Sequence, residues 1–301
     1  MIRINILKTK KAVLVAFTLL IAGASEASLA GPIVTAWDYE NDAIFTVAEF
    51  TQDPSDIWGL ETKEDYELSW GYDGGSFEDP EPVIGRSAVT IGNGTENPVT
   101  LTGGGPAKGS VNTIFGEDPP TASEIGIGIN ISHWNNPIWW GFNDLLSGTL
   151  RDTLTLTPTD GRPSINLSPL LYDFKFLETT NIGLCPDGTV GTEYDPCGDL
   201  FGLTGIPNLN PGFEYDGHDY LASIFITDGA GGVAPIGSLS NGECEILRLG
   251  HGCLGWVTAE DAITTAQFGF TIRSVPEPSS LALFGLGLAG IGYRRYKTRT
   301  A

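Results

Sequence analysis

The chain has 301 residues, with 37 acidic and 16 basic side chains and a formal net charge of −21. Such an acidic chain argues against nucleic acid and anionic lipid as partners, because both repel negative charge. The composition suits solubility, divalent cations or a hydrated extracellular matrix.

The first 30 residues are predicted to be a secretory signal peptide. An apolar run at residues 12–24 follows four cations and precedes small residues, which is the order such peptides share. We expect signal peptidase to cut after Ala30 and leave Gly31 as the first mature residue, with a cut after Ala27 as the alternative. The four cations are Arg3, Lys8, Lys10 and Lys11.

Residues 31–274 are predicted to form one all-β domain. Apolar and polar residues alternate in several segments, as they do in strands with one buried face. Turn signals such as Asp160-Gly161 and Asn241-Gly242 separate these segments. Many short strands arranged in this way predict a two-sheet sandwich or a jelly roll. The main apolar series are Leu68/Trp70/Tyr72, Ile125/Ile127/Ile129/Ile131, Leu150/Leu154/Leu156, Tyr172/Phe174/Phe176, Tyr220/Ala222/Ile224/Ile226 and Phe268/Phe270/Ile272.

Two polar residues fall on predicted apolar faces. His133 continues the series that ends at Ile131, and Asp152 lies between Leu150 and Leu154. Because alternate residues of a strand share a face, both side chains should point inward. A buried polar group needs a partner, so we expect His133 to be a structural histidine bonded to Asp152, Asn135 or a backbone carbonyl.

The other two histidines have a different setting. His218 and His251 lie in glycine-flanked loops, and we expect both to be solvated. A metal or catalytic role for His133 is the less favoured alternative, because the sequence places no second histidine near it.

The four cysteines are an even set in a chain that is predicted to be exported. They predict two disulfides, which the sequence alone could pair in three ways. We favour the two local pairings, each of which closes a short loop rich in turn-forming residues. A zinc site is the alternative, but no Cys-x-x-Cys spacing is present. The favoured pairs are Cys185 with Cys197 and Cys244 with Cys253.

Two binding hypotheses follow from local composition. Trp139 and Trp140 could stack on sugar rings, although packing in the core is the simpler explanation. We expect no cofactor and no metal, with calcium at acidic loops as an alternative. Neither loop has EF-hand spacing, and Asp-Gly is first of all a turn. The two loops contain Asp187-Gly188 with Asp195 and Asp199, and Asp216-Gly217 with Asp219.

The C-terminal segment 275–301 begins with Pro276, Glu277 and Pro278. Two prolines fix φ and remove N–H donors, so an extended, exposed linker is expected. The apolar run from 281 to 293 is shorter than the roughly 17–25 residues of a full transmembrane helix. Four cations follow the run and should stay cytoplasmic. They are Arg294, Arg295, Lys297 and Arg299.

This Pro-Glu-Pro motif, apolar stretch and basic end together resemble the PEP-CTERM sorting signal. The resemblance implies processing by an exosortase, a membrane protease-transpeptidase. It also implies a membrane-anchored intermediate, followed by delivery to the cell surface or the extracellular matrix. A plain permanent anchor is the alternative.

A second resemblance rests on the segment Ile131–Ile138, which contains Ser132, His133 and Asn135. Together with Leu68-Ser69-Trp70-Gly71 and the segment 253–260, it is similar to the THxN family of PEP-CTERM proteins. Ser132 replaces the threonine of that motif and keeps its hydroxyl. The resemblance implies an exported surface protein and no catalytic role.

The sequence contains no Gly-x-Ser-x-Gly elbow, no His-Glu-x-x-His and no phosphate loop. We therefore expect a non-enzymatic protein with a structural or adhesive role at the cell surface or in an extracellular polysaccharide (biofilm) matrix. Carbohydrate or calcium binding is the alternative molecular role.

Overall fold

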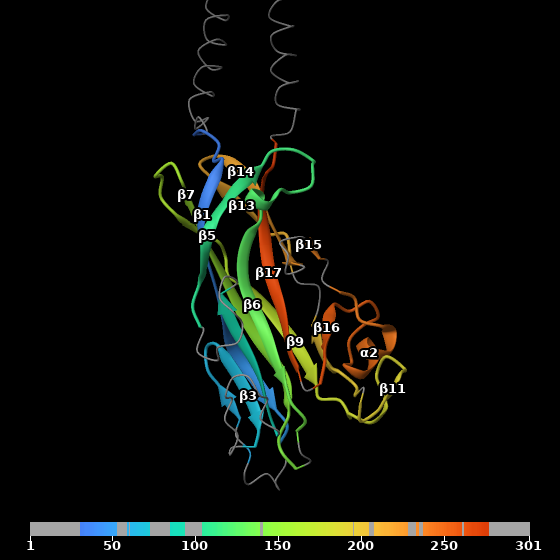
Figure 1. Cartoon of the computed structure of the whole chain (residues 1–301). Helices are drawn as coiled ribbons and strands as arrows, with labels where there is room; N and C mark the ends of the chain where they lie inside the picture. Colours follow the sequence, from blue (N-terminus) through green and yellow to red (C-terminus); the bar gives the residue numbers. More distant parts are fainter. Residues whose placement is uncertain are drawn as a thin grey trace, which may run out of the picture. The chain divides into compact units, whose positions relative to one another are not determined.

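The computed structural model describes residues 31–52, 59, 61–72, 85–93, 104–138, 141–194, 196–204, 208–227, 233–234, 237–260 and 262–276 (Figure 1). The chain divides into two compact units. The larger comprises residues 34–213 and 220–275, and the smaller comprises 1–33, 214–219 and 276–301. The predicted signal peptide and apolar C-terminal run lie outside the described residues. Among the described residues, no helix combines the length and apolarity needed to cross a bilayer.

Strands dominate the described residues, with one 3₁₀ turn, η1, and one short helix, α2. The all-β prediction is therefore confirmed. The elements in chain order are β1 (Ala36–Phe50), β2 (Thr62–Lys63), β3 (Glu67–Gly71), β4 (Arg86–Asn93), β5 (Ala107–Ile114), η1 (Ala122–Glu124), β6 (Gly126–Asn135), β7 (Leu145–Pro158), β8 (Ile165–Asn166), β9 (Leu170–Leu177), β10 (Gly183–Leu184), β11 (Val190–Gly191), β12 (Asp199–Leu203), β13 (Gly212–Tyr215), β14 (His218–Thr227), β15 (Val233–Ala234), α2 (Asn241–Ile246), β16 (Gly255–Thr258) and β17 (Ala262–Ser274).

One hydrogen-bonded path joins most of these strands in the order β16-β12-β9-β7-β1-β5-β17-β6-β4-β3-β2. Pairing along this path is antiparallel, except that β5 and β17 run parallel. Strand β8 pairs with β7, and β14 joins β13, β15 and β17, whereas β10 and β11 form a separate hairpin. The parallel contact therefore divides the path into two halves, one containing β1, β7, β9 and β12 and the other β3, β4 and β6.

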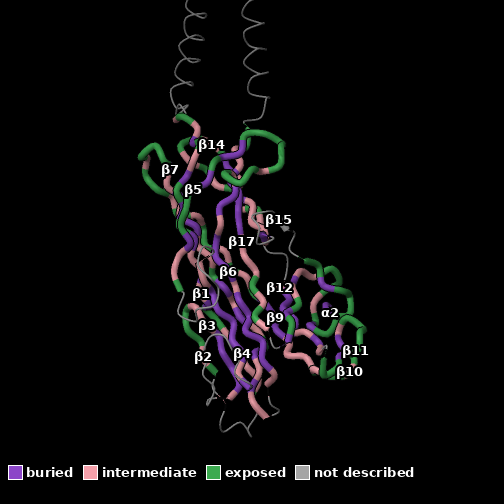
Figure 2. Tube along the Cα trace, viewed as in Figure 1, coloured by how far each residue is buried: buried purple, intermediate pink, exposed green. Residues whose placement is uncertain are grey.

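The main core shows that these two halves pack face to face. Phe45 of β1 and Phe176 of β9 belong to the same buried cluster as Trp70 of β3, Val89 of β4 and Ile129 of β6. Figure 2 shows buried positions along β6 and β17. The structure is thus the predicted two-layer sandwich, whose apolar interior supplies the main driving force for folding.

The predicted alternation correctly identifies the inward faces of several strands. Leu156, Tyr220 and Ile272 are buried, and Trp70 is fully buried. The prediction was incomplete for β6, where Asn130, Ser132 and Trp134 on the other face are buried as well. Strand β6 is hydrogen-bonded on both edges, to β4 and to β17.

One predicted turn is instead the start of a helix. Asn241-Gly242 lies in the first turn of α2, because Ser240 caps the helix and Glu243 completes a capping box. Asp216-Gly217 is a tight turn between β13 and β14, in which both residues have positive φ.

The prediction that His218 is a solvated loop residue is wrong. It is the first residue of β14 and only partly exposed, and its Nε2 lies 2.7 Å from the carbonyl oxygen of Gly31. This contact, with the hydrogen bond from the Gly31 N–H to the Asp216 carbonyl, holds residues 31–33 and 214–219 together within the smaller unit. His251 is exposed, as predicted.

Candidate functional site

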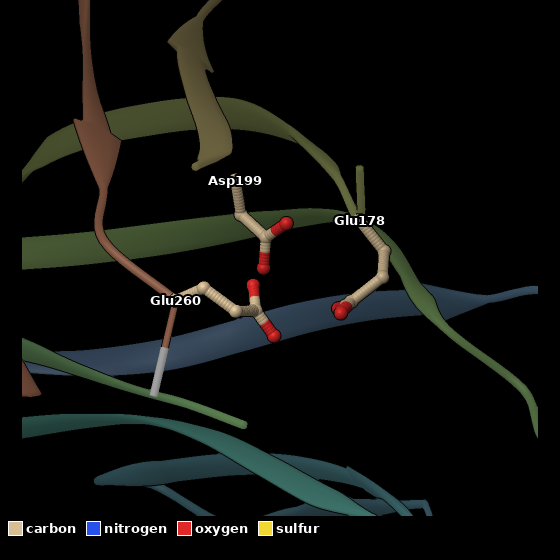
Figure 3. A group of neighbouring side chains, drawn as sticks. All are labelled: Glu178, Asp199 and Glu260. Atoms are coloured by element: carbon tan, nitrogen blue, oxygen red, sulfur yellow. The ribbon is translucent and has the colours of Figure 1, made fainter. Parts of the chain in front are cut away.

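Three carboxylates meet inside the larger unit at one end of the sandwich strands. Glu178 follows the last residue of β9, Asp199 opens β12, and Glu260 lies between β16 and β17. Each offers an oxygen, and these oxygens all lie within 4.8 Å of one another. Figure 3 shows the three side chains pointing toward one another from the start of β12 and from the segments after β9 and β16. We refer to Glu178, Asp199 and Glu260 as the acidic triad.

Strand register explains why residues so far apart in sequence meet here. Strand β12 lies between β9 and β16, and Leu200 pairs with Leu177 on one side. On the other side, Asp199 pairs with Thr258. Because β12 and β9 are antiparallel, the residue before Leu200, Asp199, lies opposite the residue after Leu177, Glu178. Two residues beyond Thr258 is Glu260, which therefore approaches from the same side.

The triad faces the interior because it continues the inward face of each strand. Phe176 is two residues before Glu178, and Phe201 is two residues after Asp199; both phenylalanines are buried in the main core. The alternating apolar series Tyr172, Phe174 and Phe176 is continued at the next alternate position by Glu178. Extending the alternation past the last apolar residue would have identified Glu178 as an inward-facing carboxylate.

Burial and electrostatic repulsion disfavour the ionisation of Glu178 and Asp199. Burial raises the pKa of Glu178 well above its usual range, and repulsion from Asp199, Glu260 and Asp144 raises it further. The pKa of Asp199 is raised for the same reasons, burial first and Glu260 second. Asp144, which lies close enough to contribute, has its own pKa raised by burial to about 6.

Hydrogen bonds satisfy only part of the triad. The backbone N–H of Thr179 donates to Oδ1 of Asp199 at 2.8 Å, and Nδ2 of Asn181 donates to Oε1 of Glu260 at 3.3 Å. Oδ2 of Asp199 and Oε2 of Glu178 are buried and accept no hydrogen bond from the described residues. Within that part of the chain, no lysine or arginine forms an ion pair with Glu178 or Asp199.

His133 lies deep in the core, as its strand position predicted, with 1% of its surface exposed. The predicted partners were wrong. Its Nδ1 shares a 2.8 Å hydrogen bond with the hydroxyl of Thr258, whereas Asp152 accepts a hydrogen bond from Asn41. The imidazole stacks on Trp70, and burial lowers its pKa to about 3, so it is neutral at physiological pH.

The other two motif residues are also buried. The Ser132 hydroxyl bonds to that of Thr265 on β17, and Nδ2 of Asn135 lies 3.5 Å from the carbonyl oxygen of Thr258. Ser132, His133 and Asn135 therefore contact the β16–β17 region through side-chain hydrogen bonds. All three residues are at most 1% exposed.

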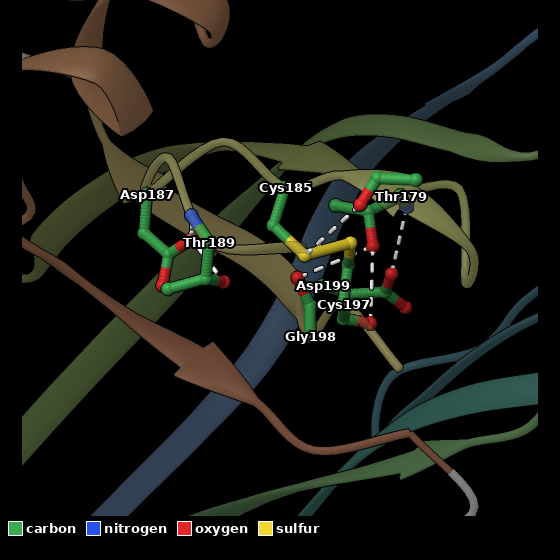
Figure 4. Close-up of a disulfide and its surroundings, with 8 residues drawn as sticks. Thr179, Cys185, Asp187, Thr189, Cys197, Gly198 and Asp199 are labelled. Atoms are coloured by element: carbon green, nitrogen blue, oxygen red, sulfur yellow. Dashed lines mark hydrogen bonds between the residues drawn. A yellow bond between two sulfur atoms is a disulfide. The ribbon is translucent and has the colours of Figure 1, made fainter. Parts of the chain in front are cut away.

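The two predicted disulfides are confirmed as Cys185–Cys197 and Cys244–Cys253. Figure 4 shows the first of them beside Asp199. The Thr179 hydroxyl lies 3.2 Å from the carbonyl oxygen of Cys197, and its N–H bonds to Asp199. The base of the first disulfide loop is thus attached directly to the acidic triad.

The first disulfide loop also carries an exposed apolar surface. Strands β10 and β11 form a hairpin in which Leu184 pairs with Val190. Leu184 and Val190 are 75% and 67% exposed, and Ile182 and Tyr194 nearby are 67% and 93% exposed. We call Ile182, Leu184, Val190 and Tyr194 the hairpin patch.

The remaining predicted site residues fall into two groups, those outside the described residues and those in an exposed turn. Trp139, Trp140 and Asp195 lie outside the described residues. Asp187 is exposed and accepts hydrogen bonds from the Thr189 N–H and hydroxyl, which make a local turn. The predicted calcium loop therefore separates into an exposed turn at Asp187 and a buried carboxylate at Asp199.

The sandwich interior also contains an apolar cavity lined mainly by aliphatic and aromatic side chains. Its polar lining residues include Asp152, Asn41 and Ser168, and Nδ2 of Asn41 donates to Oδ1 of Asp152. Burial raises the pKa of Asp152 to about 6. This carboxylate is therefore an inward-facing polar group held by a neutral amide.

Residues 274–295 match the PEP-CTERM protein-sorting motif. The match includes Pro276-Glu277-Pro278 and extends to Arg295, so it confirms the predicted nature of the C-terminal segment. The motif implies an exported protein that is sorted by an exosortase, a membrane enzyme, through a membrane-anchored intermediate. The two disulfides fit an extracellular location. No curated protein is found to match the chain.

Proposed function

We propose that this protein is a non-enzymatic component of the cell surface or extracellular matrix, cut by an exosortase after export. The observation that carries the proposal is the sorting-motif match at residues 274–295. The predicted signal peptide and the two disulfides support it, because both belong to exported chains.

Membership of the THxN group is part of this proposal. The three sequence segments that suggested it converge in the core. Trp70 of the first stacks on His133 of the second, and Thr258 of the third shares a hydrogen bond with His133. Segments that meet in one buried cluster are expected to vary together, which supports the view that they form a single structural motif.

The proposed molecular role is structural or adhesive, and the hairpin patch is its most direct support. Exposed apolar side chains that lie side by side are typical of interaction sites, and Leu184 and Val190 are cross-strand neighbours in the hairpin. The Cys185–Cys197 disulfide constrains the hairpin, which lowers the entropic cost of presenting it to a partner.

Mass spectrometry of the protein from the surface fraction tests the sorting step. We expect a C-terminus near Pro276-Glu277-Pro278. A surface protein that still ends at Ala301 would contradict exosortase cleavage and identify the segment as a plain membrane anchor.

Retention of the processed protein in the matrix fraction tests the adhesive role. The variant Leu184→Ser/Val190→Ser should be exported and cut normally but released into the medium. The matched control is Leu171→Ser, which changes another exposed leucine on β9. Equal retention of both variants and the wild type would remove the hairpin patch from the proposal.

Carbohydrate binding is the second candidate for the molecular role, based on the neighbouring Trp139 and Trp140. A polysaccharide pull-down should then weaken in Trp139→Ala/Trp140→Ala and persist in the hairpin variant. Absence of wild-type binding would eliminate this candidate.

A further inference from the structure

We propose that Glu178, Asp199 and Glu260 bind a calcium ion inside the larger unit. Glu178 is partly buried, and Asp199 and Glu260 are buried. Oxygens of the three carboxylates lie within 4.8 Å of one another, so the groups repel strongly if they ionise without a counter-charge. A divalent cation removes that repulsion and supplies the partners that buried carboxylate oxygens require. The inference concerns the folded body and is independent of the sorting step.

A second observation points to a ligand. The side chain of Asp199 is fully buried and faces the other two carboxylates (Figure 3). Its Oδ1 accepts the Thr179 N–H, but its Oδ2 has no hydrogen-bond partner among the described residues. Oε2 of Glu178 is equally buried and unpartnered within them. Buried polar atoms are nearly always satisfied, so two such oxygens in one cluster favour a bound cation.

The spacing of the carboxylate oxygens fits the coordination distances of calcium. Ca²⁺ binds oxygen at 2.3–2.6 Å, so oxygens on opposite sides of the ion are up to about 5 Å apart. The spacing in the triad falls within that limit, and a cation could be bound without large backbone movement. Hard carboxylate oxygens do not favour zinc, which prefers nitrogen and sulfur. Mg²⁺ is less suitable because it binds at 2.0–2.1 Å and gives up its waters reluctantly.

The ion would join three separate parts of the fold. Glu178 lies at the end of β9, Asp199 at the start of β12, and Glu260 in the connection from β16 to β17. Thr179 connects Asp199 to the carbonyl oxygen of Cys197, at the base of the first disulfide loop. Calcium would therefore fix the loop that carries the hairpin patch as well as the strand ends.

The test uses the exported, disulfide-bonded protein, stripped with EDTA and titrated with CaCl₂ by calorimetry and thermal unfolding. For a dissociation constant of about 0.1 mM, 10 mM Ca²⁺ should raise the Tm by about 5–10 °C. Tb³⁺ provides a second measurement, because the indole of Trp70 lies close to Glu178 and should sensitise terbium emission.

The decisive variant is Glu178→Gln/Glu260→Gln, with Asp187→Asn as the control carboxylate in an exposed turn. We expect the double variant to be at least as stable as the wild type in EDTA, since it loses repulsion, and to lose the Ca²⁺ response and the terbium signal. If the double variant does not fold, Glu260→Gln alone should weaken Ca²⁺ binding at least tenfold. Wild-type protein that ignores both EDTA and Ca²⁺, responds more strongly to Mg²⁺, or loses its response in Asp187→Asn instead would overturn the proposal.

Discussion

His133 Nδ1 lies 2.8 Å from the hydroxyl oxygen of Thr258, and both residues are almost completely buried. Thr258 stands opposite Asp199 in the β12–β16 pair. Its hydroxyl also lies 3.4 Å from the Asp199 carbonyl oxygen. A single side chain thus connects the motif histidine of β6 to the strand that carries the acidic triad.

Removal of this hydroxyl should destabilise the fold. Thr258→Val keeps the side-chain shape but leaves His133 Nδ1 without its partner in the core. An unsatisfied buried group of this kind costs about 1–3 kcal/mol in the free energy of unfolding, which urea denaturation would measure. Thr258→Ser, which keeps the hydroxyl, should lose less. If the valine variant is as stable as the wild type, the hydrogen bond contributes little to stability.

The second prediction concerns Asp152 and pH. Its pKa is about 6 in the folded protein, above the ordinary value of 3.8, because burial disfavours the charge. The folded state therefore binds more protons than the unfolded state between about pH 4 and pH 6. Over that range the free energy of unfolding falls as pH rises, by roughly 2–3 kcal/mol from this group.

Asp152→Asn should remove this contribution, and its amide oxygen can still accept the hydrogen bond from Asn41. We expect the variant and the wild type to be equally stable below pH 4 and the variant to be more stable above pH 7. Denaturation curves at several pH values would measure the difference, with Asp118→Asn as an exposed control. A stability difference that does not change with pH would show that the charge on Asp152 is not its source.

Local patterns predicted much of the fold because each depends on neighbours in sequence. Alternation revealed the inward faces around Ile129 and Phe176, and short spacing suggested the two disulfides. The capping box from Ser240 to Glu243 was also available in the sequence, but Asn241-Gly242 was interpreted as a turn. Capping residues and turn residues overlap, so composition alone did not separate the two.

The acidic triad could not be predicted because it depends on strand order. Glu178 is next to Asp199 only because β12 pairs with β9, and Glu260 joins them because β16 pairs with the other edge of β12. A sequence with 37 acidic residues offers many possible groups of three. The same non-local pairing brings Thr258, instead of the expected Asp152, to His133.

The third prediction is that the two disulfides contribute unequally to the free energy of unfolding. Cys185 and Cys197 are buried at the base of an exposed hairpin, whereas Cys244 is fully buried in a small apolar core with Leu200 and Leu247. Cys185→Ser/Cys197→Ser should cost about 2–3 kcal/mol and expose the hairpin to protease. Cys244→Ser/Cys253→Ser should cost more, because it also places a hydroxyl at position 244, in an apolar cluster of leucines. Equal losses in thermal unfolding would mean that burial of Cys244 adds nothing to the effect of the cross-link.

The last prediction concerns the glycine that lets β16 approach β12. Gly255 pairs with Gly202, and a Cβ at Gly255 would lie 2.1 Å from the carbonyl oxygen of Phe201. That oxygen belongs to the backbone, so Gly255→Ala must shift one strand against the other. We expect a loss of about 2–4 kcal/mol in the free energy of unfolding, together with weaker Ca²⁺ binding, because the same strand pair positions Asp199.

Gly250→Ala is the matched control, since a Cβ there meets no atom within 4 Å. Denaturation and calcium titration of the two variants would measure both effects. If Gly255→Ala behaves like the control, β12 and β16 are less closely packed than the geometry requires.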